Sequence, residues 1–159
     1  MEIARIVNEL SELREMRKNN EEKKIVFTSG CFDLLHYGHI CHLKESRELG
    51  DFLIVAVNSD ASIKRLKGNS KPILSEKERI SILQTLRYVD AVFLFDEDDV
   101  CNYFDIIKPD FFTIGAESAI IFSREIDVAK MVGSKVHIIK RIDNVSSTNI
   151  IEKIRGNQL

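Results

Sequence analysis

The chain has 159 residues, a net charge of −2, 44% hydrophobic and 30% charged residues, which is typical of one globular domain and excludes a disordered chain. The charge balance gives no electrostatic reason to expect nucleic acid as a partner, and three cysteines fit reduced thiols. The first residues lack a signal-peptide profile and no apolar run approaches a membrane span, so we expect a cytoplasmic protein with no membrane partner.

The opening residues predict an amphipathic helix. Their apolar side chains recur at spacings of three and four, at Ile3, Ile6, Val7, Leu10, Leu13 and Met16. A charged connector follows over residues 18–24. We therefore divide the chain into an N-terminal helix with its connector, residues 1–23, and one domain over residues 24–159.

Short apolar runs then predict five buried strands, at residues 25–29, 52–58, 91–95, 110–114 and 136–139. Helical patterns lie between them, and one is opened by Ser75 with Glu78 three residues later, which is the signature of a capping box. This alternation predicts an α/β fold, a Rossmann-like doubly wound parallel sheet with helices on both faces. Such sheets bind ligands at the carboxyl ends of their strands.

Two histidines follow the first predicted strand, His36 and His39, with Gly38 between them. They stand where a helical pattern begins, and helix starts offer unpaired N–H groups and a partial positive charge. Gly38 lets a bulky anion approach the backbone, and the imidazoles add further donors. The segment is therefore suited to a polyphosphate.

Two other interpretations of these histidines stay open. They could simply cap the helix or fill a polar corner. They could also join His42, Cys31 and Cys41 in a metal site, but residues i and i+6 point to different sides of a helix, and no Cys-x-x-Cys pair is present. We expect no metal ion held by protein ligands alone.

Two later segments also follow predicted strands. The first is basic, and Lys67 beside Gly68 is its best candidate for phosphate contact, whereas Lys64 and Arg65 also suit a solvated helix end. The second segment, residues 141–151, opens a helix with three hydroxyl side chains, Ser146, Ser147 and Thr148. Hydroxyl residues are natural N-caps, and a helix start rich in them is also a phosphate cradle.

The ten residues Gly-Cys-Phe-Asp-Leu-Leu-His-Tyr-Gly-His, at positions 30–39, resemble the HxGH signature of the cytidylyltransferase-like nucleotidyltransferases. These enzymes join a nucleoside monophosphate to a small phosphorylated acceptor and release pyrophosphate. The resemblance continues through nearly the whole chain. It implies the nucleotidyltransferase type of fold, a nucleoside triphosphate with Mg²⁺ as substrate, and a homodimer or higher oligomer.

The resemblance also implies roles for individual residues. It assigns catalysis to His36, His39 and Lys67. It assigns acceptor binding to Asp33, Arg79 and Lys67, although Asp33 equally suits a turn that orients its loop. It assigns nucleotide binding to Gly30, Cys31, Phe32, Gly38, His39, Gly115, Arg141, Ser146, Ser147 and Thr148.

Within the family, the chain looks most like the stand-alone heptose-1-phosphate adenylyltransferases of surface-sugar pathways. This favours ATP over CTP. Three residues depart from that pattern: Asn144 stands where relatives usually have glycine, Arg141 resembles glycerol-3-phosphate cytidylyltransferases, and Ile114 replaces a lysine. Arg79, Lys67 and Arg124 are the available replacements for that lysine. We therefore predict that the acceptor is a small phosphomonoester whose sugar or polyol part differs in shape or stereochemistry from the common heptose phosphate.

The reaction that these residues imply is an in-line attack by an acceptor phosphate oxygen on the α-phosphorus of the nucleotide. No nucleophilic residue is required, because positioning and charge stabilisation carry such chemistry. Mg²⁺ would be held mostly by substrate and water. Two alternatives remain: a cytidylyltransferase acting on glycerol 3-phosphate or a similar polyol or amino-alcohol phosphate, and a nucleotide-binding module without turnover.

Overall fold

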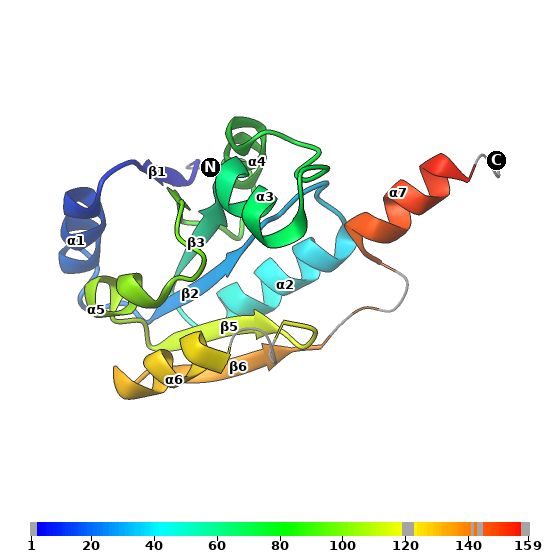
Figure 1. The fold of residues 1–159 in the computed structure, drawn as a ribbon. Helices are drawn as coiled ribbons and strands as arrows, with labels where there is room; N and C mark the ends of the chain where they lie inside the picture. Colours follow the sequence, from blue (N-terminus) through cyan, green and yellow to red (C-terminus); the bar gives the residue numbers. More distant parts are fainter. Residues whose placement is uncertain (1–2, 119–122, 141, 143–144, 157–159) are drawn as a thin grey trace.

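The computed structural model describes residues 3–118, 123–140, 142 and 145–156. Within them, six strands form one all-parallel sheet in the order β1-β4-β3-β2-β5-β6 (Figure 1). The strands are β1 (Arg5–Val7), β2 (Ile25–Gly30), β3 (Phe52–Asn58), β4 (Ala91–Phe95), β5 (Phe111–Gly115) and β6 (Lys135–Ile139). The predicted α/β class with a parallel sheet is thus confirmed.

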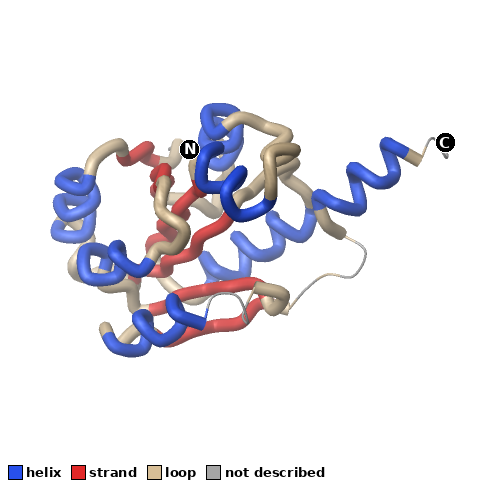
Figure 2. The backbone as a smooth tube through the Cα atoms, in the orientation of Figure 1, coloured by secondary structure: helices blue, strands red, loops and turns tan. Residues whose placement is uncertain are grey.

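Helices flank this sheet on both faces (Figure 2). They are α1 (Leu10–Lys18), α2 (Tyr37–Glu48), α3 (Asp60–Lys67), α4 (Glu76–Gln84), α5 (Phe104–Ile107), α6 (Ser123–Met131) and α7 (Ser147–Arg155), with a 3₁₀ turn, η1 (Cys101–Tyr103). One core lies between the sheet and α1, α5 and α6, and it is centred on Phe27, Phe104 and Phe112. The other lies under α2 and α4, around Leu43 and Leu83.

The prediction for the opening residues is wrong in one respect, because they contain a sixth strand. Arg5–Val7 pairs with β4 at the edge of the sheet, and α1 begins only at Leu10. Apolar spacings of three and four over so short a segment do not distinguish a strand followed by a helix from one helix. Ile3 is 67% exposed and Leu10 is 48% exposed, so these two residues do not belong to the buried face of one continuous helix. Residues 5–7 are therefore part of the sheet of the main domain.

The other predicted elements lie close to their observed positions. Strands β3 and β4 have the predicted bounds, and the ends of β2, β5 and β6 differ by one residue. Both hydrogen bonds of the capping box between Ser75 and Glu78 are present at the start of α4. None of the helices in the described ranges is both long and apolar enough for a membrane span.

Candidate active site

A cavity of about 370 Å³ opens at the carboxyl ends of β2, β5 and β6 and is also lined by the starts of α2 and α7. Figure 1 shows how these elements are arranged. Most of the predicted site residues line it together, although they come from segments far apart in the sequence. The predicted residues in its wall are Gly30, Cys31, Phe32, Asp33, His36, Gly38, His39, Lys67, Gly115, Ser146, Ser147 and Thr148. Arg79 lies outside this wall, and Arg141 and Asn144 lie outside the described residues.

The imidazoles of His36 and His39 both line the cavity. His36 occupies the N-cap position of α2 without a side-chain capping hydrogen bond, so helix capping does not explain its presence. Its ring stacks on that of His39, with 3.8 Å between centroids. A Cβ atom at position 38 would lie 3.0 Å from His36 Cε1, so Gly38 makes room for this ring.

The pKa values of both imidazoles lie below the usual range, which favours the neutral form at pH 7. Burial is the main cause, and together with the neighbouring His36, His42 and Lys67 it lowers the pKa of His39 to about 3. Burial also lowers the pKa of His36. The Nδ1 atoms of His36 and His39 are buried and have no hydrogen-bond partner in the described part of the chain. Buried polar atoms are normally paired, so the pair fits a ligand that supplies polar partners.

Two lysines supply positive charge to the same cavity. Lys67 ends α3, and Lys71 follows in the connecting segment. The Lys71 Nζ atom is buried and has no partner among the residues described. Lys71 was not among the predicted site residues, although it lies four residues after Lys67 in the same basic segment. Arg65, by contrast, forms ion pairs with Asp96 and Asp98 at the exposed end of α3.

Asp33 anchors the segment that carries Lys71. Its two carboxylate oxygens accept hydrogen bonds from the backbone N–H groups of Ile73 and Leu74, each at 2.9 Å. Its backbone oxygen accepts a hydrogen bond of 2.5 Å from the Ser147 hydroxyl at the start of α7. Asp33 therefore connects three segments of the cavity wall, which matches the loop-orienting role considered from the sequence.

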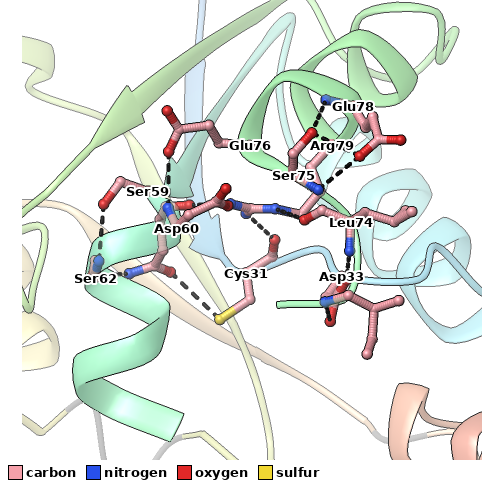
Figure 3. A network of polar contacts seen from close by, with 12 residues as sticks. Cys31, Asp33, Ser59, Asp60, Ser62, Leu74, Ser75, Glu76, Glu78 and Arg79 are labelled. Carbon is pink, nitrogen blue, oxygen red and sulfur yellow. Dashed lines mark hydrogen bonds and ion pairs between the residues drawn. The ribbon is translucent and has the colours of Figure 1, made fainter. Parts of the chain in front are cut away.

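Arg79 has a different role from the one that the sequence suggested. Its side chain is 1% exposed, and its guanidinium donates to the backbone oxygens of Leu74, Cys31 and Asn58 at 3.1, 2.6 and 2.8 Å (Figure 3). It also pairs with the Asp60 carboxylate at 2.8 Å. Because the N–H groups of the guanidinium already donate to these protein oxygens, the structure does not support direct binding of the acceptor by Arg79. Arg79 holds together the loops around the cavity.

Ile114 is likewise a packing residue. It is 3% exposed and belongs to the core beneath α1, α5 and α6, whereas its neighbour Gly115 lines the cavity. Arg124 forms an exposed ion pair with Asp99 instead of lining the cavity. Neither residue is among those that line the cavity, and a different acceptor shape stays a prediction.

The hydroxyl groups at the start of α7 are partly occupied by the protein itself. Ser146 is the N-cap and accepts from the Asn149 N–H, and the Ser147 hydroxyl donates to Asp33 as described above. Thr148 is exposed and lines the cavity. The backbone N–H groups of this helix start add to those of α2, so two positive helix ends border one cavity.

The part of the cavity wall that the structure describes offers Mg²⁺ no set of three or more protein ligands. No group of three or more His, Cys, Asp or Glu residues in the described ranges has the placement needed to hold a metal ion. The Asp33 carboxylate already accepts two backbone N–H groups, and His42 Nε2 lies 2.8 Å from Thr28 Oγ1. Lysines and neutral imidazoles fit an ion that arrives with a triphosphate and keeps much of its water.

Comparison with known proteins gives a consistent result. The profile of the cytidylyltransferase-like family matches residues 27–153. The bifunctional protein HldE of Syntrophotalea carbinolica is 46% identical over 132 residues, which are 83% of this chain and 27% of that protein. HldE of Campylobacter concisus is 43% identical over 146 residues, 92% of this chain and 30% of that protein. The chain thus spans less than a third of the length of these two relatives.

Solved structures show the same similarity. The lipopolysaccharide core biosynthesis protein from Thermoplasma volcanium is 35% identical with a TM-score of 0.60, and the match covers 76% of this chain and 97% of that one. The pantoate-beta-alanine ligase from Francisella tularensis has a TM-score of 0.67 at 16% identity over 96% of this chain and 77% of that one, which shows a shared fold.

Proposed function

Because the chain belongs to the cytidylyltransferase-like family, we propose that it is a nucleotidyltransferase that transfers AMP from ATP to a sugar phosphate such as heptose 1-phosphate, with release of pyrophosphate. The observation that carries the proposal is one cavity at the strand ends that combines two lysines with a stacked pair of histidines. The Nδ1 atoms of these histidines have no hydrogen-bond partner among the described residues. This set of side chains suits a polyphosphate that must be held and polarised.

The chemistry requires no covalent intermediate with the protein. A phosphate oxygen of the acceptor attacks the α-phosphorus in line, the new P–O bond forms, and the bond to the leaving pyrophosphate breaks. Neutral His36 and His39 donate hydrogen bonds to phosphate oxygens, and Lys67 and Lys71 neutralise charge on the triphosphate. Donors that are already in place when charge develops lower the barrier most effectively.

Mg²⁺ enters this proposal as part of the nucleotide substrate. When bound, it neutralises charge on the donor phosphates. The protein's own contribution is the two helix starts and the lysines, which hold the remaining oxygens in place.

The choice of ATP and of a heptose phosphate rests on similarity. Support comes from the identity with HldE proteins and with the lipopolysaccharide core biosynthesis protein. We further propose that the enzyme works in the cytoplasm, where nucleoside triphosphates are available, and that it forms a homodimer or larger oligomer.

Pyrophosphate release tests this proposal. The purified chain is assayed with ATP or CTP, each combined with stereoisomers of heptose 1-phosphate or with glycerol 3-phosphate, and His39→Ala serves as the inactive control. We expect the highest kcat/KM with ATP and a heptose phosphate. A preference for CTP and glycerol 3-phosphate would assign the chain to the cytidylyltransferase branch. Nucleotide binding without pyrophosphate release from any pair would contradict an enzymatic role.

A further inference from the structure

One side of α2, the helix that begins with the histidine pair, packs on the sheet through polar groups. Leu43 and Ser46 are its fully buried residues, and Leu43 belongs to the apolar core shared with α4. Beside Leu43, a stripe with spacings of three and four carries His42, Glu45 and Ser46. These spacings place the three polar side chains on one side of the helix.

The sheet presents a matching row of polar side chains. Thr28 of β2 is in register with Thr113 of β5, and Thr113 is in register with His137 of β6. Register partners in a parallel sheet point to the same face. Thr28 and Thr113 are both 0% exposed. Three neighbouring strands therefore present one continuous polar row beneath α2.

Each residue of the helix stripe meets one residue of this row. His42 Nε2 lies 2.8 Å from Thr28 Oγ1, Ser46 Oγ lies 2.7 Å from Thr113 Oγ1, and Glu45 Oε1 lies 2.7 Å from His137 Nε2. The contact between Ser46 and Thr113 is buried, the contact between His42 and Thr28 is partly buried, and the contact between Glu45 and His137 is half-exposed. Hydrogen bonds are directional and work over a narrow range of distances, whereas apolar contacts tolerate sliding.

The proton position in the contact between His42 and Thr28 follows from counting donors and acceptors. The Thr28 hydroxyl has one hydrogen, and the Thr113 backbone oxygen accepts it at 2.9 Å. His42 Nε2 must therefore donate to Thr28 Oγ1. Burial, the largest cause, lowers the pKa of His42 to about 4, so the ring is neutral and carries its proton on Nε2 at pH 7.

We infer that this polar row sets the position of α2 along the sheet, and that His42, through Thr28, is a positioning residue for the imidazoles of His36 and His39. His42 lies one helical turn after His39 and borders the same cavity. Movement of α2 along its axis would carry the histidine pair away from the ends of β2 and β5. A displacement of about 1 Å at a catalytic group can lower a rate about a hundredfold.

The kinetic test rests on the proposed function and compares four variants. Thr28→Val and His42→Leu remove the bridge, Thr28→Ser retains the hydroxyl, and His42→Gln offers an amide N–H in place of Nε2–H. The control Leu43→Val weakens the apolar packing of the same helix. We expect Thr28→Val and His42→Leu to lower kcat about ten- to a hundredfold with little change in the KM for the nucleotide.

The other variants have specific expected results. The losses of kcat caused by Thr28→Val and His42→Leu should not add in the double variant, because both substitutions remove the same contact. Thr28→Ser and His42→Gln should restore most of kcat, and Leu43→Val should lower the melting temperature while keeping kcat. The inference is overturned if kcat follows the melting temperature through all variants, or if the two losses of kcat add.

A spectroscopic test is independent of turnover. Side-chain ¹H–¹⁵N correlation spectra of the full chain at pH 7 should show His42 as the neutral Nε2–H tautomer. Thr28→Val should alter that tautomer and shift the ring signals of His36 and His39, whereas Leu43→Val should leave the tautomer unchanged. An Nδ1–H tautomer in the wild type, or unshifted His36 and His39 signals in Thr28→Val, would refute the inference. A wild type without turnover would count against the proposed function only.

Discussion

Replacing Arg79 with methionine should lower the stability of the fold, and this loss should be the main effect rather than weaker acceptor binding. The guanidinium lies inside the protein and donates to the backbone oxygens of Cys31, Asn58 and Leu74 as well as to the Asp60 carboxylate (Figure 3). Methionine fills a similar volume and offers none of these hydrogen bonds. The variant therefore leaves several oxygens unpaired around a side chain that is 1% exposed.

The size of the effect can be estimated from these contacts. Removing one partner of a buried ion pair costs about 3–5 kcal/mol. Each buried acceptor left unpaired costs about 1–3 kcal/mol, but Asp60 is 30% exposed and water can reach it. We expect Arg79→Met to lower the free energy of unfolding by about 3–5 kcal/mol. That is a large fraction of the roughly 5–15 kcal/mol that stabilises a typical domain.

Urea denaturation followed by circular dichroism measures this loss. With a slope of about 2 kcal/mol per molar urea, the midpoint should fall by about 2 M. Arg79→Lys should recover little, because an ammonium cannot reproduce the planar fork that reaches several oxygens. Arg124→Met is the matched control: this arginine is 73% exposed in its pair with Asp99, so its replacement should change stability by less than about 1 kcal/mol.

The alternative interpretation makes the opposite prediction. If Arg79 bound the acceptor, Arg79→Met would keep nearly wild-type stability and raise the KM for the acceptor alone. A variant with an unchanged urea midpoint and a selectively raised acceptor KM would refute the network argument.

Three further predictions concern the cavity. His39→Ala should lower kcat about 10²–10³-fold, the scale for one preorganised donor, while the urea midpoint stays near wild type; normal turnover would remove His39 from the mechanism. Lys71→Met should raise the KM for the nucleotide about tenfold in steady-state assays, since its buried Nζ has no partner in the described part of the chain; an unchanged KM would exclude phosphate contact. Stability should fall as the pH drops from about 6.5 toward 4, because burial lowers the pKa of His39 to about 3 and of His42 to about 4, whereas unfolded histidines bind protons near pH 6.5. Urea midpoints at pH 7 and pH 5 measure this, and His42→Gln should reduce the dependence; an equal dependence in both proteins would contradict it.

The sequence by itself determined the elements whose causes are local. The apolar runs of β3 and β4 and the capping box of Ser75 and Glu78 depend on neighbours a few residues away, and they appear where the pattern predicts them. The position of the histidine motif could also be predicted from the sequence, because ligand sites of parallel sheets lie where a strand ends and the next helix begins. The edge strand Arg5–Val7 was missed, because its pairing partner lies more than eighty residues away in β4.

Only the tertiary structure decided which partners the polar side chains find. The family resemblance implied that Asp33 and Arg79 bind the acceptor. In the structure, the Asp33 carboxylate and the Arg79 guanidinium instead form hydrogen bonds with backbone groups of other segments. The burial of the Lys71 Nζ atom, which has no partner among the described residues, likewise depends on distances between segments. The row formed by Thr28 and Thr113 depends on strand register. Periodicity in the sequence specifies which face of an element a residue occupies. A hydrogen bond, however, requires a partner within about 3 Å, and only the folded chain brings segments that are distant in the sequence to this distance.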